Sequence, residues 1–179
     1  MNKIDWNQSY NNNAKFTPVS EIVLDKLKLR GKQALDIGCG TGDLLRQLAA
    51  RGFDITGVDL SSVAIEKAKE QPGTFIAGDF MDADLSGSYD VIFINKVLAF
   101  VDDKKAFLNK ARSLLSPEGK IVIITPVLHE EYKSKYSQRL KNISIGIAEL
   151  KKLLPAGWSE VDLRYFDDYG HELTLELYK

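Results

Sequence analysis

Cysteine and histidine are scarce in this 179-residue sequence, which contains one of the former and two of the latter. A single cysteine excludes an intramolecular disulfide and fits a reducing compartment, so a cytoplasmic location is expected. So few metal-binding side chains predict no metal site. The sequence also lacks an apolar signal core at its start and any run of 18 apolar residues, so neither a secretion signal nor a membrane span is predicted.

Charge of either sign is not in excess, because 24 Lys and Arg face 25 Asp and Glu, for a net charge of −1. This balance predicts no overall field that would attract nucleic acid or an anionic membrane surface. Hydrophobic residues make up 44% and charged residues 27% of the chain, as in ordinary globular proteins. The length predicts one domain, residues 1–179, with a sizeable core.

Glycines recur at alternate positions after the apolar run of residues 34–37, at Gly38, Gly40 and Gly42. Glycine adopts positive φ and lacks Cβ, so a ligand can approach the backbone closely. A second apolar segment follows and ends in the carboxylate of Asp59. An acidic residue at the end of the second strand of such a unit can accept hydrogen bonds from both ribose hydroxyls. The pattern predicts a nucleoside-containing cofactor.

The glycine spacing distinguishes between cofactors. A dinucleotide fingerprint reads Gly-x-Gly-x-x-Gly, with a diphosphate at the helix N-terminus. Asp43 stands where the third glycine would fall, and its negative charge would oppose a diphosphate. A nicotinamide-dependent oxidoreductase is therefore disfavoured. Glycines that serve only the geometry of a strand–helix turn remain an alternative.

Residues 35–42 read Leu-Asp-Ile-Gly-Cys-Gly-Thr-Gly. This segment resembles the first motif of the class I S-adenosylmethionine-dependent methyltransferases, and the resemblance extends over roughly residues 16–179. It implies an α/β fold with a Rossmann-like, doubly wound, seven-stranded sheet that is mostly parallel and ends in an antiparallel C-terminal hairpin. It also implies S-adenosyl-L-methionine as the cofactor, and an N-terminal segment, residues 1–16, that covers it with Trp6 and Tyr10.

Hydropathy patterns predict the strands of that sheet. Short apolar stretches mark three strands, and two continuous apolar runs mark strands buried on both faces. Alternating residues near the end of the chain mark a hairpin of half-buried antiparallel strands, with a turn at residues 167–170. The predicted strands are 33–37, 54–59, 74–77, 91–94, 121–124, 161–165 and 173–177.

Three local patterns predict further features. The polar residues 7–13 predict a loop. Thr17-Pro18 predicts a helix start, and that helix would present an apolar face made of Val19, Ile22, Val23 and Leu27. The segment Ser116-Pro117-Glu118-Gly119 fits a type I turn.

The resemblance assigns roles to the glycine loop. Asp36 would orient the α-amino group of the cofactor. The loop itself would cradle the methionine part and the sugar, through Gly38, Cys39, Gly40 and Gly42. Cys39 is expected to be a small residue that fits this loop rather than a catalytic or redox-active group.

The next two strand ends would bind the nucleoside. Asp59 would accept the ribose hydroxyls, although it could instead cap the helix that follows. Leu60 would contact adenine. By the same resemblance, Asp79 would accept a hydrogen bond from the adenine amino group and Phe80 would lie against the ring; Asp79 could instead cap a turn.

The acceptor side carries a weaker pattern. Asn95 could bond the amino-acid end of the cofactor, and Lys96 is either a site residue or a surface residue. Residues 129–143 would cover the acceptor, and His129 and Tyr132 within them are candidate catalytic residues together with Asn95.

Methyl transfer from a sulfonium needs positioning and desolvation but no obligatory base. The resemblance therefore implies a methyltransferase that acts on a small-molecule acceptor, and the sequence, which shows no Ser/His/Asp arrangement, agrees with it. A methyltransferase-like binding or regulatory protein without turnover, or an RNA or protein methyltransferase, remains an alternative. Neither the acceptor nor the oligomeric state follows from the sequence.

Overall fold

The chain is described as a computed structural model and divides into two compact units, Met1–Ser86 and Gly87–Lys179. The first unit contains the glycine loop, and the second contains the C-terminal hairpin. The residues described by the structure are 4–12, 16, 18–128, 144–146, 149, 152–153, 159–165 and 172–178.

The first unit is built on three parallel strands: β1 (Gln33–Ile37), β2 (Asp54–Asp59) and β3 (Thr74–Ala77), in the order β3-β2-β1. All three predicted strands are confirmed at their predicted bounds. Ile37 lies opposite Val58 in the register. Because the strands are parallel, their carboxyl ends lie at one edge, and the glycine loop and the carboxylate at the end of β2 meet there.

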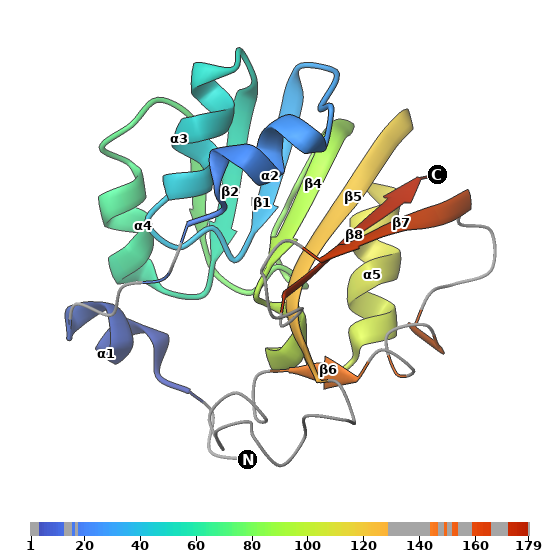
Figure 1. Cartoon of the computed structure of the whole chain (residues 1–179). Helices are drawn as coiled ribbons and strands as arrows, with labels where there is room; N and C mark the ends of the chain where they lie inside the picture. Colours follow the sequence, from blue (N-terminus) through green and yellow to red (C-terminus); the bar gives the residue numbers. More distant parts are fainter. Residues whose placement is uncertain are drawn as a thin grey trace. The chain divides into compact units, whose positions relative to one another are not determined.

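Two helices pack on this sheet (Figure 1): α3 (Asp43–Ala50) contacts β1 and β2, and α4 (Ser62–Ala68) contacts β2 and β3. Ser61 caps α4, because its Oγ accepts a hydrogen bond from Ala64 N at 3.1 Å. Each helix turns an apolar stripe toward the strands, and the buried residues are Leu44, Leu45, Leu48, Ala64, Ile65 and Ala68.

The predicted loop at residues 7–13 is wrong, because Trp6–Asn11 forms helix α1. Asp5 caps it, since the carboxylate Oδ1 accepts from Gln8 N at 2.9 Å. Its side chains are mostly polar, but Tyr10 is buried. A six-residue helix with one buried residue shows no apolar periodicity, so composition alone suggested a loop.

Helix α2 runs from Glu21 to Lys26 and therefore starts later than predicted. Its cap is Ser20, whose Oγ accepts from Val23 N at 3.3 Å. Val23 is buried as predicted, but Ile22 is 67% exposed, so its assignment to the apolar face was wrong. Val19 and Leu27, which lie just outside the helix, are also buried as predicted.

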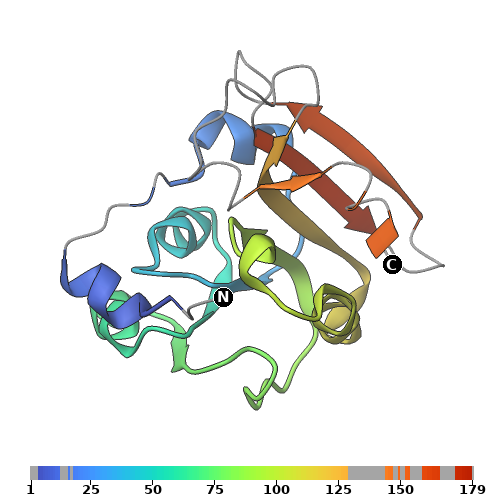
Figure 2. The ribbon, with the colours of Figure 1, turned by 90° about the horizontal axis from the view of Figure 1, so that it is seen from below.

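The second unit begins with β4 (Tyr89–Asn95), which pairs in parallel with β5 (Leu115–Leu128). The 3₁₀ helix η1 (Leu98–Phe100) and helix α5 (Lys104–Ser113) connect them, and α5 packs along β5 (Figure 2). Both continuous apolar runs lie within these strands and are buried, which confirms that prediction.

The C-terminal hairpin is confirmed. Strands β7 (Ser159–Tyr165) and β8 (Glu172–Tyr178) pair antiparallel, and β8 lies between β5 and β7. The two-residue strand β6 (Ile145–Gly146) adds a parallel pairing to β5. The described residues thus hold eight strands rather than the predicted seven, because a two-residue strand leaves no sequence pattern. The predicted turn at residues 167–170 lies outside the described residues.

Strand β8 is not half-buried as predicted, because consecutive residues from Thr174 to Leu177 are all buried. Glu176 is one of the polar residues that alternate with leucines along β8, and it is buried as well. Its Oε2 lies 2.5 Å from Lys120 Nζ and accepts from the Tyr178 hydroxyl at 3.0 Å. A paired carboxylate can occupy an interior position that a lone one could not.

The predicted turn at residues 116–119 is instead an irregularity inside β5. The register moves from Tyr89 opposite Leu115 to Val91 opposite Lys120. Between these two pairs β5 contains more residues than β4. The extra residues form a bulge, and the strand continues beyond it.

Candidate functional site

The glycine loop has the backbone that its sequence predicts. Gly38, Gly40 and Gly42 have φ values of 78°, 53° and 78°, a region in which other residues are strained. The amides of Gly38 and Cys39 both donate to the Val58 carbonyl, at 2.7 and 3.1 Å. The loop is therefore fixed to the end of β2.

Asp59 completes this attachment through its side chain. Oδ2 accepts from Gly40 N and Oδ1 accepts from Ser61 N, both at 2.8 Å. The side-chain cap of α4 is Ser61, so Asp59 is not that cap. Burial raises the pKa of Asp59, and its two backbone hydrogen bonds lower it again in part. Each carboxylate oxygen can accept more than one hydrogen bond, so Asp59 can support the loop and also receive a donor from a ligand.

Asp36 is the buried acid of the site that lacks a partner. Its side chain lies on β1 and is 2% exposed, and Oδ1 has no hydrogen-bond partner in the described part of the chain. Burial raises its pKa from 3.8 to about 8, and the carboxylate of Asp59 contributes to the rise. A buried carboxylate without a partner is unfavourable, and a cation with N–H donors would satisfy it.

Apolar and acidic groups follow on the next strand ends. Leu60 is 56% exposed, whereas Phe80 is buried. Asp79 is exposed, and its Oδ1 accepts a hydrogen bond from Met81 N at 2.9 Å. This contact is the one expected if Asp79 caps a turn. Gly78 N donates to the Asp59 carbonyl at 2.9 Å. The ends of β2 and β3 are thereby joined beside the glycine loop.

Asn95 and Lys96 belong to the second unit, at the end of β4. The Asn95 Oδ1 is buried with no hydrogen-bond partner among the described residues. Lys96 has a φ of 59°, and its amide donates to the Ile124 carbonyl at 2.7 Å. A non-glycine residue in this conformation is uncommon and recurs at functional sites. The other predicted acceptor-side residues, His129, Tyr132 and the segment 129–143, lie outside the described residues.

Two polar residues that sequence reasoning missed support the site. Gln71 Nε2 donates to the Gly42 carbonyl at 3.1 Å, and Asn7 Oδ1 accepts from Ser61 Oγ at 2.8 Å. Each contact joins residues that are far apart in the sequence, and neither residue stands in a recognisable motif. No local signal could have identified them.

The thiol of Cys39 is a packing group. It is buried, and burial raises its pKa, so the thiol stays protonated at neutral pH. A Cβ built on Gly57 of β2 would lie 2.7 Å from the Cys39 Sγ. The close approach explains why β2 has glycine there and agrees with a small residue that fits the loop.

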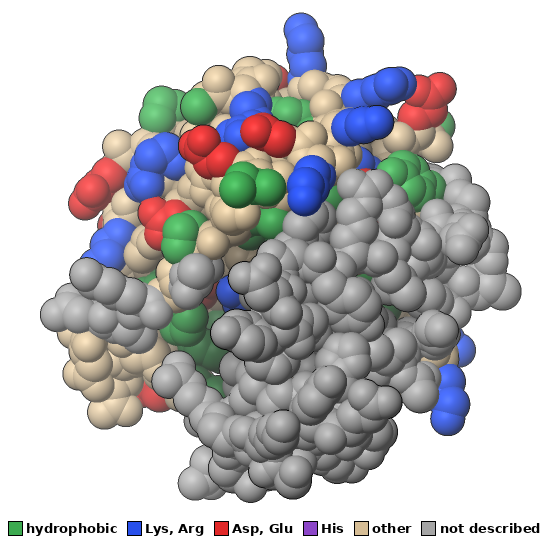
Figure 3. Space-filling view, viewed as in Figure 1, with side chains coloured by type: hydrophobic (Ala, Val, Ile, Leu, Met, Phe, Trp, Pro, Cys, Tyr) green, Lys and Arg blue, Asp and Glu red, His purple; other side chains and the backbone are tan. Residues whose placement is uncertain are grey.

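Metal clusters and membrane-spanning helices are both absent from the described part of the chain. Across the described residues, no group of three acidic, histidine or cysteine side chains is arranged to hold a metal ion. Within the same residues, no helix is both long and apolar enough to cross a membrane. On the face seen in Figure 3, the described basic and acidic side chains are interspersed.

This arrangement is that of a known family. The sequence profile described as "Methyltransferase domain" matches residues 28–169. The match covers most of the chain, so the protein belongs to this methyltransferase family, and the resemblance seen in the glycine loop is confirmed.

Curated relatives point in the same direction. The chain is 31% identical over 160 residues to the ubiquinone biosynthesis O-methyltransferase of Paraburkholderia phymatum, covering 81% of this chain and 66% of that protein. It is 30% identical over 123 residues to the mitochondrial ubiquinone biosynthesis O-methyltransferase of Schizosaccharomyces pombe, covering 64% and 45%. The chain thus spans about half the length of several relatives that it matches.

Solved structures confirm the fold class. The plantazolicin methyltransferase BamL, solved in complex with a desmethylPZN analog and SAH, matches with a TM-score of 0.69 and 21% identity, over 86% of this chain and 79% of that one. The PH0226 protein of Pyrococcus horikoshii matches with a TM-score of 0.72 and 18% identity, over 88% and 87%.

Proposed function

We propose that the chain binds S-adenosylmethionine at the carboxyl ends of β1, β2 and β3 and transfers its methyl group to a small-molecule acceptor. The observation that carries this proposal is the buried carboxylate of Asp36, whose Oδ1 has no hydrogen-bond partner among the described residues. It lies beside a glycine loop held by Asp59. The α-ammonium group of S-adenosylmethionine is a cation with three N–H donors, which is what this carboxylate lacks.

The other groups of the site fit the rest of the cofactor. The two ribose hydroxyls would donate to Asp59, which keeps acceptor capacity beyond its two backbone bonds. The exposed side chain of Leu60 would be covered by adenine, with Asp79 toward the amino group and Phe80 as the buried floor. The relatives support the same ligand, because BamL was solved with SAH.

When bound, the cofactor supplies a methyl group attached to a positively charged sulfur, and the leaving group is the neutral thioether. An acceptor lone pair would form the new bond to the methyl carbon as the carbon–sulfur bond breaks, and the acceptor proton would pass to water or to a nearby base. The chain's own contribution is to bind, to align and to exclude water. Asn95, His129 and Tyr132 are the residues proposed to meet the acceptor.

A small-molecule acceptor is supported by the relatives, whose names place them in ubiquinone biosynthesis. The balanced charge of the chain argues against a nucleic acid substrate. The single, buried Cys39 fits a reducing cytoplasm.

Calorimetry with S-adenosylmethionine, its demethylated product and NADH tests the binding step. Binding of the first two and not of NADH is expected, and the reverse would refute the proposal. Turnover is tested by incubating the protein with a metabolite extract and methyl-labelled cofactor, followed by mass spectrometry. Binding without any labelled product would favour a regulatory, non-catalytic protein.

Cofactor binding is expected to release about one proton per site at about pH 6.5. The pKa of Asp36 is about 8 in the free protein, so the group is protonated there and must ionise to pair with the ammonium. Calorimetry in two buffers with different ionisation enthalpies measures the release. The Asp36→Asn variant is the control and should release none, whereas a parent protein whose binding enthalpy ignores the buffer would contradict this role.

A further inference from the structure

The side chain of Asn7 joins the N-terminal helix α1 to α4. Asn7 Oδ1 accepts from Ser61 Oγ at 2.8 Å and from Val63 N at 3.3 Å. Ser61 Oγ already accepts from Ala64 N, so its hydroxyl proton is directed to Asn7. The attachment is therefore specific in the direction of each hydrogen bond, and Figure 1 shows α1 beside α4.

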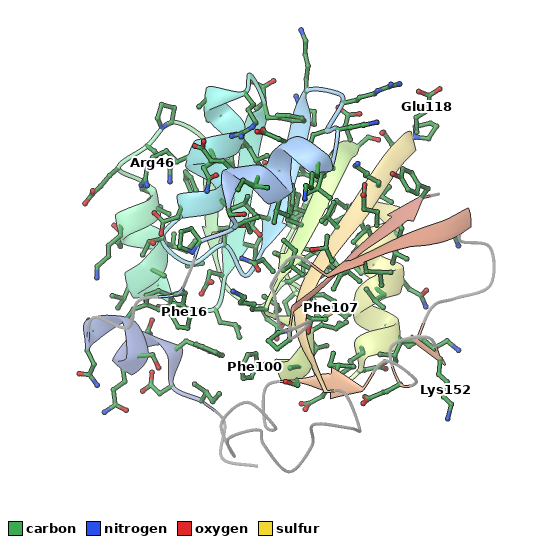
Figure 4. All side chains as sticks on the ribbon, in the orientation of Figure 1. Phe16, Arg46, Phe100, Phe107, Glu118 and Lys152 are labelled. Atoms are coloured by element: carbon green, nitrogen blue, oxygen red, sulfur yellow. The ribbon has the colours of Figure 1, made fainter. Side chains whose placement is uncertain are left out.

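Tyr10, three residues further along α1, lies against the glycine loop. It is 8% exposed, and a Cβ built on Gly40 would lie 2.5 Å from its hydroxyl oxygen. Burial, followed by the carboxylate of Asp59, raises the pKa of Tyr10, so the phenol is a neutral donor. The Phe16 ring, labelled in Figure 4, packs on Tyr10 with a centroid distance of 5.4 Å.

The contacts of Asn7 and Tyr10 complete a closed chain of interactions that starts and ends on α1. Asn7 bonds the side chain of Ser61, the amide of Ser61 bonds one oxygen of Asp59, and the other oxygen bonds the amide of Gly40. Tyr10 then rests on Gly40 and returns to the same helix as Asn7. Both ends of α1 thus contact the groups that Asp59 orders, so the position of α1 and the state of that carboxylate are linked.

We propose that Asn7 is a positioning residue that fastens α1 over the bound cofactor, so that the cofactor leaves only after the Asn7–Ser61 bond breaks. This inference rests on the proposed function, because it requires a cofactor on Asp59. A cofactor held by Asp36 and Asp59 would lie close to the Tyr10 hydroxyl, which rests on Gly40, so the ligand would favour the closed position of α1. The coupling is reciprocal, since whatever stabilises α1 in its closed position also increases the affinity for the cofactor.

Stopped-flow kinetics and hydrogen exchange on the full chain test the proposal. Asn7→Ala should speed dissociation of S-adenosylmethionine by about 2- to 12-fold, the range for losing one net hydrogen bond. Asn7→Asp keeps an acceptor oxygen and should restore much of the parent rate. Gln8→Ala changes an exposed neighbour on the same helix and should leave the rate unchanged. Cofactor should slow exchange of the α1 amides in the parent more than in Asn7→Ala.

The outcomes separate the two proposals. A parent protein that binds no S-adenosylmethionine overturns the proposed function and the fastening of α1 with it. If the parent binds S-adenosylmethionine, two results would overturn only the role of Asn7. One is an Asn7→Ala variant with the same dissociation rate as the parent, and the other is hydrogen exchange of the α1 amides that does not change when cofactor is added. An equally faster dissociation rate in Asn7→Ala and Gln8→Ala would also refute it, because the effect would then belong to the helix in general.

Discussion

Replacing Asp36 by asparagine is expected to lower the affinity for S-adenosylmethionine by about 30- to 5,000-fold while making the free protein more stable. Loss of one partner of a buried charge pair costs about 2–5 kcal/mol. In the free protein the same side chain is buried with no hydrogen bond to Oδ1 among the described residues, and burial penalises its charged form. Asparagine cannot ionise, so the free variant should be more stable at pH 8, where Asp36 is partly charged. Calorimetry and chemical denaturation measure the two effects.

The gain in stability should depend on pH in a defined direction. The pKa of Asp36 is raised from 3.8 to about 8 on folding, so between these values the native state binds more protons than the unfolded state. Stability therefore falls as pH rises through this window. The advantage of Asp36→Asn should be larger at pH 8 than at pH 5. A variant that binds the cofactor like the parent would show that Asp36 is not its partner.

Asp59→Ala should weaken cofactor binding by about 10- to 150-fold, because charge-assisted hydrogen bonds contribute about 1.5–3 kcal/mol. In contrast to Asp36→Asn, it should also destabilise the fold by about 1–3 kcal/mol, since the buried amides of Gly40 and Ser61 lose their acceptor. Titration calorimetry and thermal melting of the same samples distinguish the two effects.

Asp82→Ala is the control for Asp59→Ala, because it also replaces one aspartate by alanine but at an exposed position. It should change neither affinity nor melting temperature appreciably. If Asp59→Ala melts earlier but retains the parent's affinity, then Asp59 supports the loop and does not contact the ligand.

The strands of the first unit and the glycine loop were predictable because they depend on local rules. Short stretches rich in apolar residues mark β1 to β3. The positive φ of Gly38, Gly40 and Gly42 is a conformation that glycine itself permits. The carboxyl ends of parallel strands share an edge, so Asp36 and Asp59 were expected together. The structure places both beside the loop, as predicted.

What could not be predicted depends on contacts between distant residues. Tyr10 is buried because it meets Gly40, and Asn7 matters because it meets Ser61; the polar sequence around them suggested a loop instead. Likewise, Ser116 to Gly119 have turn residues, but the pairing of β5 with β4 continues beyond them and makes them a bulge. Local propensity is overridden wherever the partner lies elsewhere in the chain.

The buried pair of Lys120 and Glu176 has a consequence for which arrangements of the hairpin are possible. In the native register, Lys120 lies opposite Tyr178, and Glu176 reaches it across β5 and β8. A slip of one residue would exchange the two faces of β8, placing a leucine where the acid belongs and leaving an ammonium inside without its partner. Buried ion pairs often add little net stability. The pair of Lys120 and Glu176 instead specifies the register, because a shifted pairing of β8 with β5 would have a higher free energy.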